Sequence, residues 1–380
     1  MSDFPEKLSR KLIRRQEENS FRELKPQQDL IDFSSNDYLG LSRTSLLQSA
    51  TNEILKSNSS FNGATGSRLL TGNHNLYSEL ESYLKSFYDF ESALIFNSGY
   101  DANVGFFSCV PQRNDIIFYD ELIHASIRDG IKMSDAKAFK FKHNNVDDLR
   151  GQIDKIREKD FYEEIYVVTE SVFSMDGDSP NISELAKFCN EHSLYFIVDE
   201  AHAIGVFGKG LVVEKNLQEK VFAQIITFGK AIGSHGAAIL GSKPLKEYLI
   251  NFARSLIYTT ALAPHSIASI LAAHQFLEVE YGKSLIEKLR QNIHYFNQTI
   301  EALHLRQVFL LSTSAIQIAL ISGNIAVRSL SITLMESGFD IRPILAPTVP
   351  KGNERLRICL HAFNTKDEIE RVLLLIKENG

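Results

Sequence analysis

The middle of the chain alternates short apolar runs with stretches of helical periodicity, and this alternation constrains the possible folds more than any other feature. The runs are rich in Ile, Val and Phe, and each ends in polar residues or glycine: Ala93–Phe96, Ile116–Tyr119, Ile165–Thr169, Tyr195–Val198, Ile225–Phe228 and Ala237–Leu240. Continuous apolar runs of this length are typical of strands buried on both faces of a parallel sheet. Because they alternate with helices, they predict an α/β fold in which helices sandwich a mostly parallel central sheet.

The two ends of the chain differ in pattern from the middle. Residues 5–19 predict an opening helix. After about residue 285 we expect a long helix, two short strands and a last helix that opens with a capping box: Ser284–Leu303, Ala315–Leu320, Arg357–Leu360, and Thr365 with Glu368. The pattern therefore predicts an N-terminal helix and segment (1–45), a large α/β domain (46–285) and a smaller C-terminal α+β domain (286–380).

Composition and charge exclude several classes of protein. A net charge of -6 gives no footprint for nucleic acid. No apolar run reaches the ~18–20 residues that cross a bilayer, and the first residues lack the apolar core of a secretory signal. The three cysteines, Cys109, Cys189 and Cys359, are far apart, which argues against a disulfide framework and a zinc site. We expect a cytoplasmic protein that binds no metal, no membrane and no nucleic acid.

Polar residues follow several of the proposed strands. In open parallel sheets, ligands bind at the carboxyl ends of the strands. The segments there are Asn97-Ser98-Gly99-Tyr100, His124 in Leu-Ile-His-Ala-Ser, Glu170 to Asp178, Asp199-Glu200-Ala201-His202 and Thr227-Phe228-Gly229-Lys230. Each has an ordinary alternative, because a lone lysine is usually solvated, a lone histidine is usually structural, and Asp199 with His202 can be a helix cap or half a metal site. The functional interpretation gains weight because all of these segments belong to one edge of one sheet.

Other ligand motifs fail when they are read residue by residue. Gly229-Lys230 lacks the earlier glycine of a P-loop and is followed by Ala. The chain contains no H-E-x-x-H metal motif and no G-x-S-x-G nucleophile elbow. Phosphate-loop nucleotide binding, zinc hydrolysis and serine hydrolysis are therefore set aside.

The candidate residues match what pyridoxal 5′-phosphate (PLP) requires around its ring. Lys230 supplies an amine that can form an imine with the cofactor. Asp199 supplies a carboxylate for the pyridine nitrogen, which lets the protonated ring accept electrons. His202 is placed one turn beyond Asp199 to donate to the phenolic oxygen, and His124 can cover the ring face. The phosphate requires backbone N–H groups at a helix start together with hydroxyl groups, and the chain offers both in Ser98, Gly99, Tyr100 and Thr227.

Longer motifs extend over nearly the whole chain: Phe33-Ser-Ser-Asn-Asp-Tyr-Leu-Gly-Leu41, Gly66-Ser-Arg-Leu-Leu-Thr-Gly-Asn73, Ser171-Val-Phe-Ser-Met-Asp-Gly-Asp178, Val198-Asp-Glu-Ala-His202, Thr227-Phe-Gly-Lys230, and Pro347-Thr-Val-Pro350 followed by Arg355-Leu-Arg357. Any one of them is a weak signal, but together they are highly specific. With these motifs the chain resembles the α-oxoamine synthases, a family of fold-type I PLP enzymes.

The resemblance implies a role for each matching residue. Lys230 looks like the Schiff-base lysine, which also removes the α-proton of the amino acid, and Asp199 like the partner of the pyridinium. His202 looks like the donor to the phenolic oxygen, and His124 like the histidine stacked on the ring. Ser174 and Thr227 match hydroxyl groups that contact the cofactor, and Gly99 with Tyr100 matches the phosphate loop, next to Ser98. Thr260 matches a threonine that reaches the phosphate of the neighbouring subunit, which implies a homodimer.

Three further residues match the substrate side of the family. Arg357 looks like the clamp on the amino acid carboxylate, because a guanidinium binds a carboxylate with two parallel hydrogen bonds. Asn36 matches a residue near that carboxylate, and Arg342 is a third candidate. The chain departs from the family in additional residues between Arg342 and the Pro347 segment, and in Leu211 at a position where glycine is common.

The resemblance also implies a reaction, in which a small amino acid condenses with an acyl-CoA, loses CO2 and gives an α-amino ketone. The length and the Ser-Asn-Asp-Tyr-Leu-Gly segment look most like the branch that joins L-alanine to pimeloyl-CoA or pimeloyl-ACP in biotin synthesis. Other branches use glycine or serine with different acyl groups. A non-catalytic partner subunit of the same fold would be expected to lose the lysine or the aspartate, and both are present here.

Overall fold

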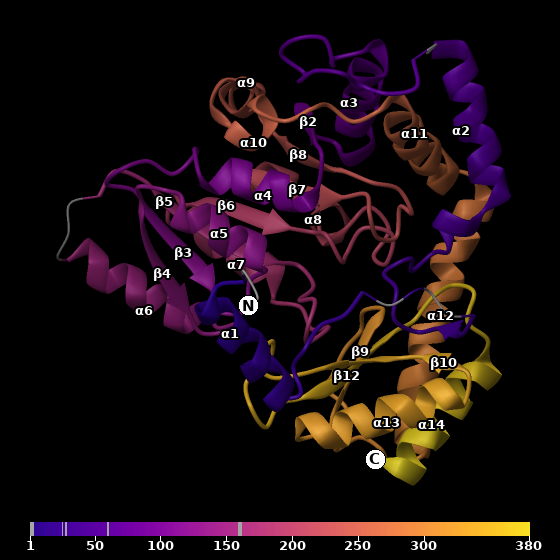
Figure 1. Cartoon of the computed structure of the whole chain (residues 1–380). Helices are drawn as coiled ribbons and strands as arrows, with labels where there is room; N and C mark the ends of the chain where they lie inside the picture. The colour runs from indigo at the N-terminus through magenta and orange to yellow at the C-terminus, as the bar shows by residue number, and fades with distance from the viewer. Residues whose placement is uncertain (1–3, 25, 27–28, 59–60, 159–161) are drawn as a thin grey trace. The chain divides into compact units, whose positions relative to one another are not determined.

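The computed structural model describes residues 4–24, 26, 29–58, 61–158 and 162–380, which form two compact units (Figure 1). The larger unit comprises Asn36–Ser174 and Asp178–Arg290, and the smaller unit comprises the described residues up to Ser35, Met175–Gly177 and Gln291–Gly380. The divisions after Ser35 and Arg290 compare with predicted boundaries after residues 45 and 285. The short segment Met175–Gly177, which belongs to the smaller unit, has no counterpart in the predicted domain boundaries.

The larger unit is built on a seven-stranded sheet with the strand order β2-β8-β7-β6-β5-β3-β4. All of the strands predicted from apolar runs are present: β2 (Ser92–Phe96), β3 (Ile116–Asp120), β5 (Ile165–Glu170), β6 (Tyr195–Asp199), β7 (Ala223–Thr227) and β8 (Ala237–Gly241). Strand β8 runs antiparallel to both of its neighbours, and the other pairings in the sheet are parallel. The predicted α/β class with a mostly parallel sheet is confirmed.

The sequence analysis missed the edge strand β4 (Lys137–Phe141), which pairs in parallel with β3. Its residues are exposed except for Phe141, so it contains no continuous apolar run that could predict it. Lys137 and Lys140 lie on this outer strand, and charged side chains at a sheet edge discourage pairing with another chain.

Helices cover the sheet on one face through α4 (Gly99–Phe107) and α5 (Ala125–Lys132), where Phe106 and Ile127 pack with strand residues such as Ile197 in a buried core (Figure 1). The other helices of the larger unit are α2 (Ser45–Asn58), α3 (Asn75–Tyr88), α6 (Val146–Arg157), α7 (Ile182–Glu191), α8 (Leu211–Glu214), α9 (Lys243–Phe252), α10 (Arg254–Ile257) and α11 (Pro264–Glu278). The alternation of strands and helices thus places the start of α4 at Gly99, shortly after β2 ends at Phe96.

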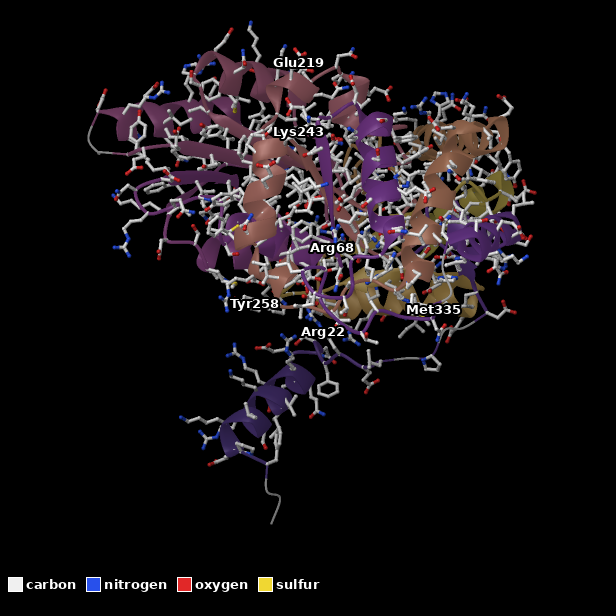
Figure 2. All side chains as sticks on the ribbon, turned by 90° about the horizontal axis from the view of Figure 1, so that it is seen from above. Arg22, Arg68, Glu219, Lys243, Tyr258 and Met335 are labelled. Carbon is white, nitrogen blue, oxygen red and sulfur yellow. The ribbon has the colours of Figure 1, made fainter. Side chains whose placement is uncertain are left out.

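Arg68, labelled in Figure 2, fixes the segment between residues 66 and 73 to helix α3. Its Nη1 lies 2.7 Å from Glu81 Oε1, and its guanidinium carbon lies 4.0 Å from the centre of the Tyr77 ring. Lys246 Nζ binds the second oxygen of Glu81 at 2.7 Å. Because Glu81 is buried, removing Arg68 would leave a buried carboxylate with fewer partners, and such a loss is destabilising.

The smaller unit contains a three-stranded antiparallel sheet and its own helices. The sheet has the order β11-β12-β9, and two short strands, β1 and β10, pair in parallel. The elements are α1 (Glu6–Glu17), β1 (Ile31–Asp32), β9 (Ile316–Leu320), α13 (Asn324–Glu336), β10 (Phe339–Asp340), β11 (Arg342–Ile344), β12 (Arg355–Cys359) and α14 (Lys366–Asn379), while α12 (Glu280–Ala302) begins in the larger unit. The predicted capping box of Thr365 and Glu368 is confirmed at the start of α14. Within the described residues, no helix combines the length and the apolar character that a membrane span requires.

Candidate active site

Three adjacent parallel strands end in acidic residues at the same edge of the sheet. Strands β3, β5 and β6 end at Asp120, Glu170 and Asp199, and Glu170 is the register partner of Asp199. The neighbouring strand β7 ends at Thr227, three residues before Lys230. The strand ends therefore bring carboxylates, a hydroxyl and an amine together, as the position of ligand sites in such sheets leads one to expect.

A cavity of about 250 Å³ opens at this edge of the larger unit. Most of the predicted site residues line it: Asn36, Ser98, Gly99, Tyr100, His124, Asp199, His202, Thr227 and Lys230. The sequence analysis gave no role to the remaining lining residues: Asn103, Ser126, Glu170, Ala201, Gly229, His235 and Gly236. The edge that the apolar runs predicted is thus a real concave site.

The carboxylate of Asp199 is buried and held by two hydrogen bonds. The backbone N–H of Ala201 donates to Oδ1 at 2.9 Å, and the side-chain amide of Asn103 donates to Oδ2 at 2.8 Å. Asn103 lies on α4 and was not predicted as a site residue, because an isolated polar residue inside a helix carries no local signal. The two donors fix the plane of the carboxylate before any ligand arrives.

His202 contacts the hydroxyl of Tyr38, which comes from the Phe33–Leu41 motif. The Tyr38 oxygen lies 2.7 Å from His202 Nδ1 and 3.2 Å from Asn36 Oδ1. Tyr38 donates its hydroxyl proton to Asn36 Oδ1, and its contact with Nδ1 holds the orientation of the His202 ring.

His124 caps the N-terminus of α5 and keeps one side open to the cavity. Its Nδ1 accepts from the backbone N–H of Ser126 at 3.2 Å and contacts Ser126 Oγ at 2.7 Å. Burial lowers the pKa of His124; the nearby carboxylate of Asp199 opposes this effect, Lys230 adds to it, and the net shift is downward. The neutral imidazole is therefore favoured, which suits a ring that stacks against another ring.

Glu170 lies beneath this histidine and was missed as a site residue. It is 3% exposed, and its Oε1 accepts from the backbone N–H of His124. Burial, followed by the charge of Asp199, raises the pKa of Glu170 well above its ordinary value. A protonated carboxyl group at this point avoids a second negative charge beside Asp199.

The start of α4 and the end of β7 form the part of the cavity that fits a phosphate. Ser98 is the N-cap of α4, and its Oγ accepts from the backbone N–H of Asp101 at 3.1 Å. Thr227 Oγ1 is buried and makes no hydrogen bond within the described residues. A Cβ at Gly99 would lie 2.5 Å from Thr227 Cγ2, so only glycine leaves this cradle open. A helix N-terminus with an unused buried hydroxyl is a favourable place for a phosphate group.

The other predicted residues lie outside the cavity lining. Ser174 is half-buried at the end of its segment in the larger unit. Thr260 is exposed, and its backbone oxygen accepts from the amide of Asn97 at 2.7 Å. Arg342 and Arg357 belong to the smaller unit, where they are register partners on β11 and β12.

The contacts of the two arginines in the smaller unit differ. The guanidinium of Arg342 forms an ion pair with Asp340, with Nη2 3.1 Å from Oδ2. Arg357 Nη1 lies 3.0 Å from Cys359 Sγ, and the thiol is a weak partner. The carboxylate of Asp340 thus already engages Arg342.

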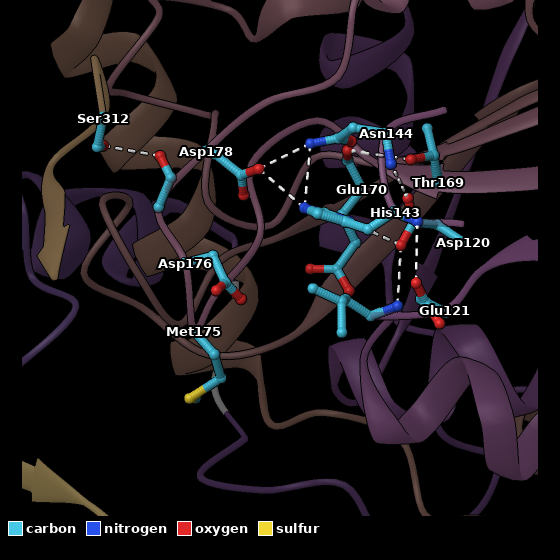
Figure 3. Close-up of polar contacts among 12 residues, drawn as sticks. Asp120, Glu121, His143, Asn144, Thr169, Glu170, Met175, Asp176, Asp178 and Ser312 are labelled. Atoms are coloured by element: carbon cyan, nitrogen blue, oxygen red, sulfur yellow. Dashed lines mark hydrogen bonds and ion pairs between the residues drawn. The ribbon is translucent and has the colours of Figure 1, made fainter. Parts of the chain in front are cut away.

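A second polar cluster, centred on His143, lies beside the site in the larger unit (Figure 3). His143 Nδ1 is 2.9 Å from Asp120 Oδ1, and Nε2 is 2.8 Å from Asp178 Oδ2. The amide of Asn144 also donates to Asp178 at 2.7 Å. Burial alone lowers the pKa of His143, but hydrogen bonds to Asp120 and Asp178 outweigh it and raise the pKa to about 10. The histidine is thus a half-buried cation that joins the end of β3 to Asp178.

This cluster predicts a pH-dependent contribution to stability. Below about pH 6.5, the ordinary pKa of histidine, folded and unfolded chains both carry the proton and the contribution is complete. As the pH rises through the folded pKa of about 10, the contribution is lost, with a slope of at most ~1.4 kcal/mol per pH unit. Urea unfolding of the wild type and His143→Gln between pH 6 and 10 measures it. The gap between their free energies of unfolding should shrink with pH, and a constant gap would contradict the prediction.

Comparisons with known proteins were made for the whole chain. Residues 28–376 match the family model described as Aminotransferase class I and II, and the chain belongs to this family. An 8-amino-7-oxononanoate synthase from Emericella nidulans is 41% identical over 90% of this chain and 87% of its own length. A putative 8-amino-7-oxononanoate synthase from Methanococcus vannielii is 38% identical over 97% of both chains.

Solved structures support the same assignment. The 8-amino-7-oxononanoate synthase from Francisella tularensis has a TM-score of 0.75 and 30% identity, covering 93% of this chain and 98% of that one. A serine palmitoyltransferase from Sphingomonas wittichii has a TM-score of 0.84 and 28% identity, covering 92% and 87%. A further SPT structure that contains PLP has a TM-score of 0.85 and 26% identity, covering 93% of this chain and 88% of that one. The predicted family, the fold-type I PLP transferase fold and the PLP cofactor are confirmed.

Proposed function

We propose that the chain is an 8-amino-7-oxononanoate synthase that condenses L-alanine with a pimeloyl thioester and releases CO2 and the thiol carrier, in the cytoplasm. The observation that carries this proposal is the cavity in which Lys230, Asp199, His124 and His202 meet, in a chain 41% identical to a synthase of that name. The carrier is CoA or acyl carrier protein. PLP, when bound, supplies the electron sink for the carbanion chemistry.

The four residues that would surround the cofactor ring have different roles. Lys230 would hold the cofactor through its amine and would accept the α-proton of the amino acid. Asp199, fixed by Asn103 and Ala201, would stabilise a proton on the ring nitrogen. His124 would lie against the ring, and His202 would donate a hydrogen bond to it. These roles are supported by the cavity geometry and by the matching motifs.

The phosphate end and the substrate end use other residues. The N-terminus of α4 at Ser98, Gly99 and Tyr100, with Thr227, is suited to the phosphate, and Ser174 is proposed as an additional hydroxyl contact. On the substrate side, we propose that Arg357 binds the alanine carboxylate with help from Asn36. Arg342 has a secondary role because Asp340 already neutralises it.

Arg357→Ala is expected to raise the KM for the amino acid by about 10- to 100-fold, because a charge-assisted hydrogen-bond pair is lost. The KM for the thioester should change much less. Steady-state kinetics with each substrate varied in turn separates the two constants. Arg371→Ala, at an exposed position on α14, is the matched control and should leave both unchanged. An effect confined to the thioester constant would exclude the assigned role.

We also propose that the chain acts as a homodimer, with Thr260 reaching the phosphate of the second subunit. Large apolar side chains are exposed near it: Leu69 (52%), Leu70 (81%) and Tyr258 (73%), the last labelled in Figure 2. The backbone N–H of Ala261 donates to Gly66 O at 3.0 Å, which joins the segments that present these side chains. Such exposed apolar groups favour a protein partner. Leu70→Asp should shift sedimentation toward the monomer, while Leu374→Asp on α14 should not.

Turnover of substrate pairs tests the function directly. L-alanine with pimeloyl-CoA or pimeloyl-ACP should be used in preference to glycine with acetyl-CoA and to serine with palmitoyl-CoA. The similarity to serine palmitoyltransferase structures makes the last pair the principal alternative. Faster turnover of either competing pair would reject the alanine and pimeloyl assignment while leaving the α-oxoamine synthase chemistry in place.

A further inference from the structure

A chain of hydrogen bonds connects His124 to Asp199 through two residues for which no role was predicted. His124 Nδ1 is 2.7 Å from Ser126 Oγ, Ser126 Oγ is 3.0 Å from Asn103 Nδ2, and the same Nδ2 is 2.8 Å from Asp199 Oδ2. Ser126 and Asn103 are 1% and 2% exposed. The two groups proposed to face the cofactor from different sides are therefore linked through buried atoms.

The direction of each bond follows from the number of protons available. Only the NH2 end of the Asn103 amide can face a carboxylate, so one N–H points to Asp199 and the other to Ser126 Oγ. Ser126 Oγ therefore accepts from Asn103, and its single proton remains for His124 Nδ1. The backbone N–H of Ser126 also donates to Nδ1. Nδ1 thus faces two donors, and a proton placed on it would lose the bond from the backbone N–H and reverse the bond with Ser126 Oγ.

We propose that Asn103 and Ser126 are positioning residues that hold His124 as a neutral imidazole with its proton on Nε2. The proposal concerns the proton position in this chain, and its catalytic meaning rests on the proposed function. The neutral ring can lie against a cationic pyridine ring without charge repulsion, and Nε2–H remains a donor for a ligand in the cavity.

The charged groups around His124 act in both directions. Asp199 and Asp129 favour a proton on the ring, whereas burial and Lys230 disfavour it, and the net effect lowers the pKa of His124. Glu170 contacts the backbone N–H of His124, and burial and Asp199 raise its own pKa. The two donors at Nδ1 add to the forces that keep the ring neutral and also select which nitrogen is protonated.

The side-chain amide of Asn103 couples the position of His124 to that of Asp199. Because one NH2 group serves both Ser126 and Asp199, a displacement of Asn103 disturbs the histidine and the aspartate together. Asn103 Oδ1 is buried and makes no hydrogen bond within the described residues, so the amide is held by its donors alone. Loss of the amide should therefore affect the chemical step more than the binding of either substrate.

Nuclear magnetic resonance of the holoenzyme labelled with [15N]histidine tests the proton position without using turnover. The His124 signal is assigned by its loss in His124→Gln. At pH 7 it should show the neutral form with the proton on Nε2. In Ser126→Ala the titration midpoint should rise by about one pH unit, because a hydrogen bond to the neutral form is lost. Ser126→Thr, which keeps the hydroxyl, should restore the wild-type midpoint, and the signal of His235 should not move in either variant.

The outcomes separate this inference from the proposed function. A proton on Nδ1, or on both nitrogens, in the wild type at pH 7 overturns the inference even if every variant is unstable. An unchanged midpoint in folded Ser126→Ala also overturns it. A protein that shows the Nε2–H form but does not condense alanine with a pimeloyl thioester retains the inference and rejects the proposed substrates.

Discussion

Lys230→Ala is expected to lower turnover by at least ~10³-fold, because one side chain both attaches the cofactor and moves the α-proton. Lys230 follows β7 and lines the cavity with Asp199 and His124, and no other lysine lines that cavity among the described residues. No second lysine lining the cavity, among the described residues, can therefore replace the amine of Lys230. The loss should appear in kcat, since both duties belong to the chemical steps.

Covalent trapping provides the second measurement on this variant. Borohydride reduction followed by peptide mass spectrometry should place a pyridoxyl group on residue 230 of the wild type and on no residue of Lys230→Ala. Lys215→Ala, at an exposed position after α8, is the matched control and should keep both the adduct and the activity. A pyridoxyl group on another lysine of the wild type would reject the assignment.

Asp199→Ala and Asp199→Asn are expected to lower kcat by about 10²- to 10⁴-fold while cofactor retention falls much less. The carboxylate supplies the negative charge that keeps the ring nitrogen protonated, and an amide supplies the shape without the charge. In Asp199→Asn one of the two donors, Asn103 or Ala201, must also face an N–H group. The asparagine variant is therefore not expected to rescue activity.

The absorbance of bound PLP and kcat should be measured on the same samples, so that loss of cofactor is separated from loss of chemistry. Asp147→Asn, at an exposed position in the first turn of α6, is the control for a lost surface charge. Full turnover in Asp199→Asn would show that charge at this position is not needed, and it would remove the pairing from the mechanism.

The sequence was most informative where physical constraints are local. Buried strands need continuous apolar runs, so the six runs predicted six strands of the sheet and the edge at which Asp199 and Lys230 meet. Strand β4 was not predicted, because an exposed edge strand needs no continuous apolar run. The capping box of α14 was predicted because both of its partners lie within four residues.

The missed site residues depend on contacts that sequence spacing does not encode. Asn103 and Asp199 are 96 positions apart, and Tyr38 and His202 are 164 apart. Tyr38 stood within a motif, which was the one signal that could have found it. Glu170 followed a predicted strand, but its importance depends on its burial between neighbouring acids. The ion pair of Arg342 with Asp340 likewise required the fold to be known.

The reversed direction of β8 determines how the catalytic amine is carried. Thr227 and Ala237 are register partners, so the connection between β7 and β8 is a hairpin whose two stems are anchored in adjacent strands. Inside it, Phe228 N–H bonds to Gly236 O at 2.9 Å and Gly233 N–H bonds to Lys230 O at 2.8 Å. Lys230 therefore lies in a short hairpin loop that internal hydrogen bonds close, and not in a long crossover connection. We expect insertions in this loop to be tolerated far less than insertions in other loops of the larger unit.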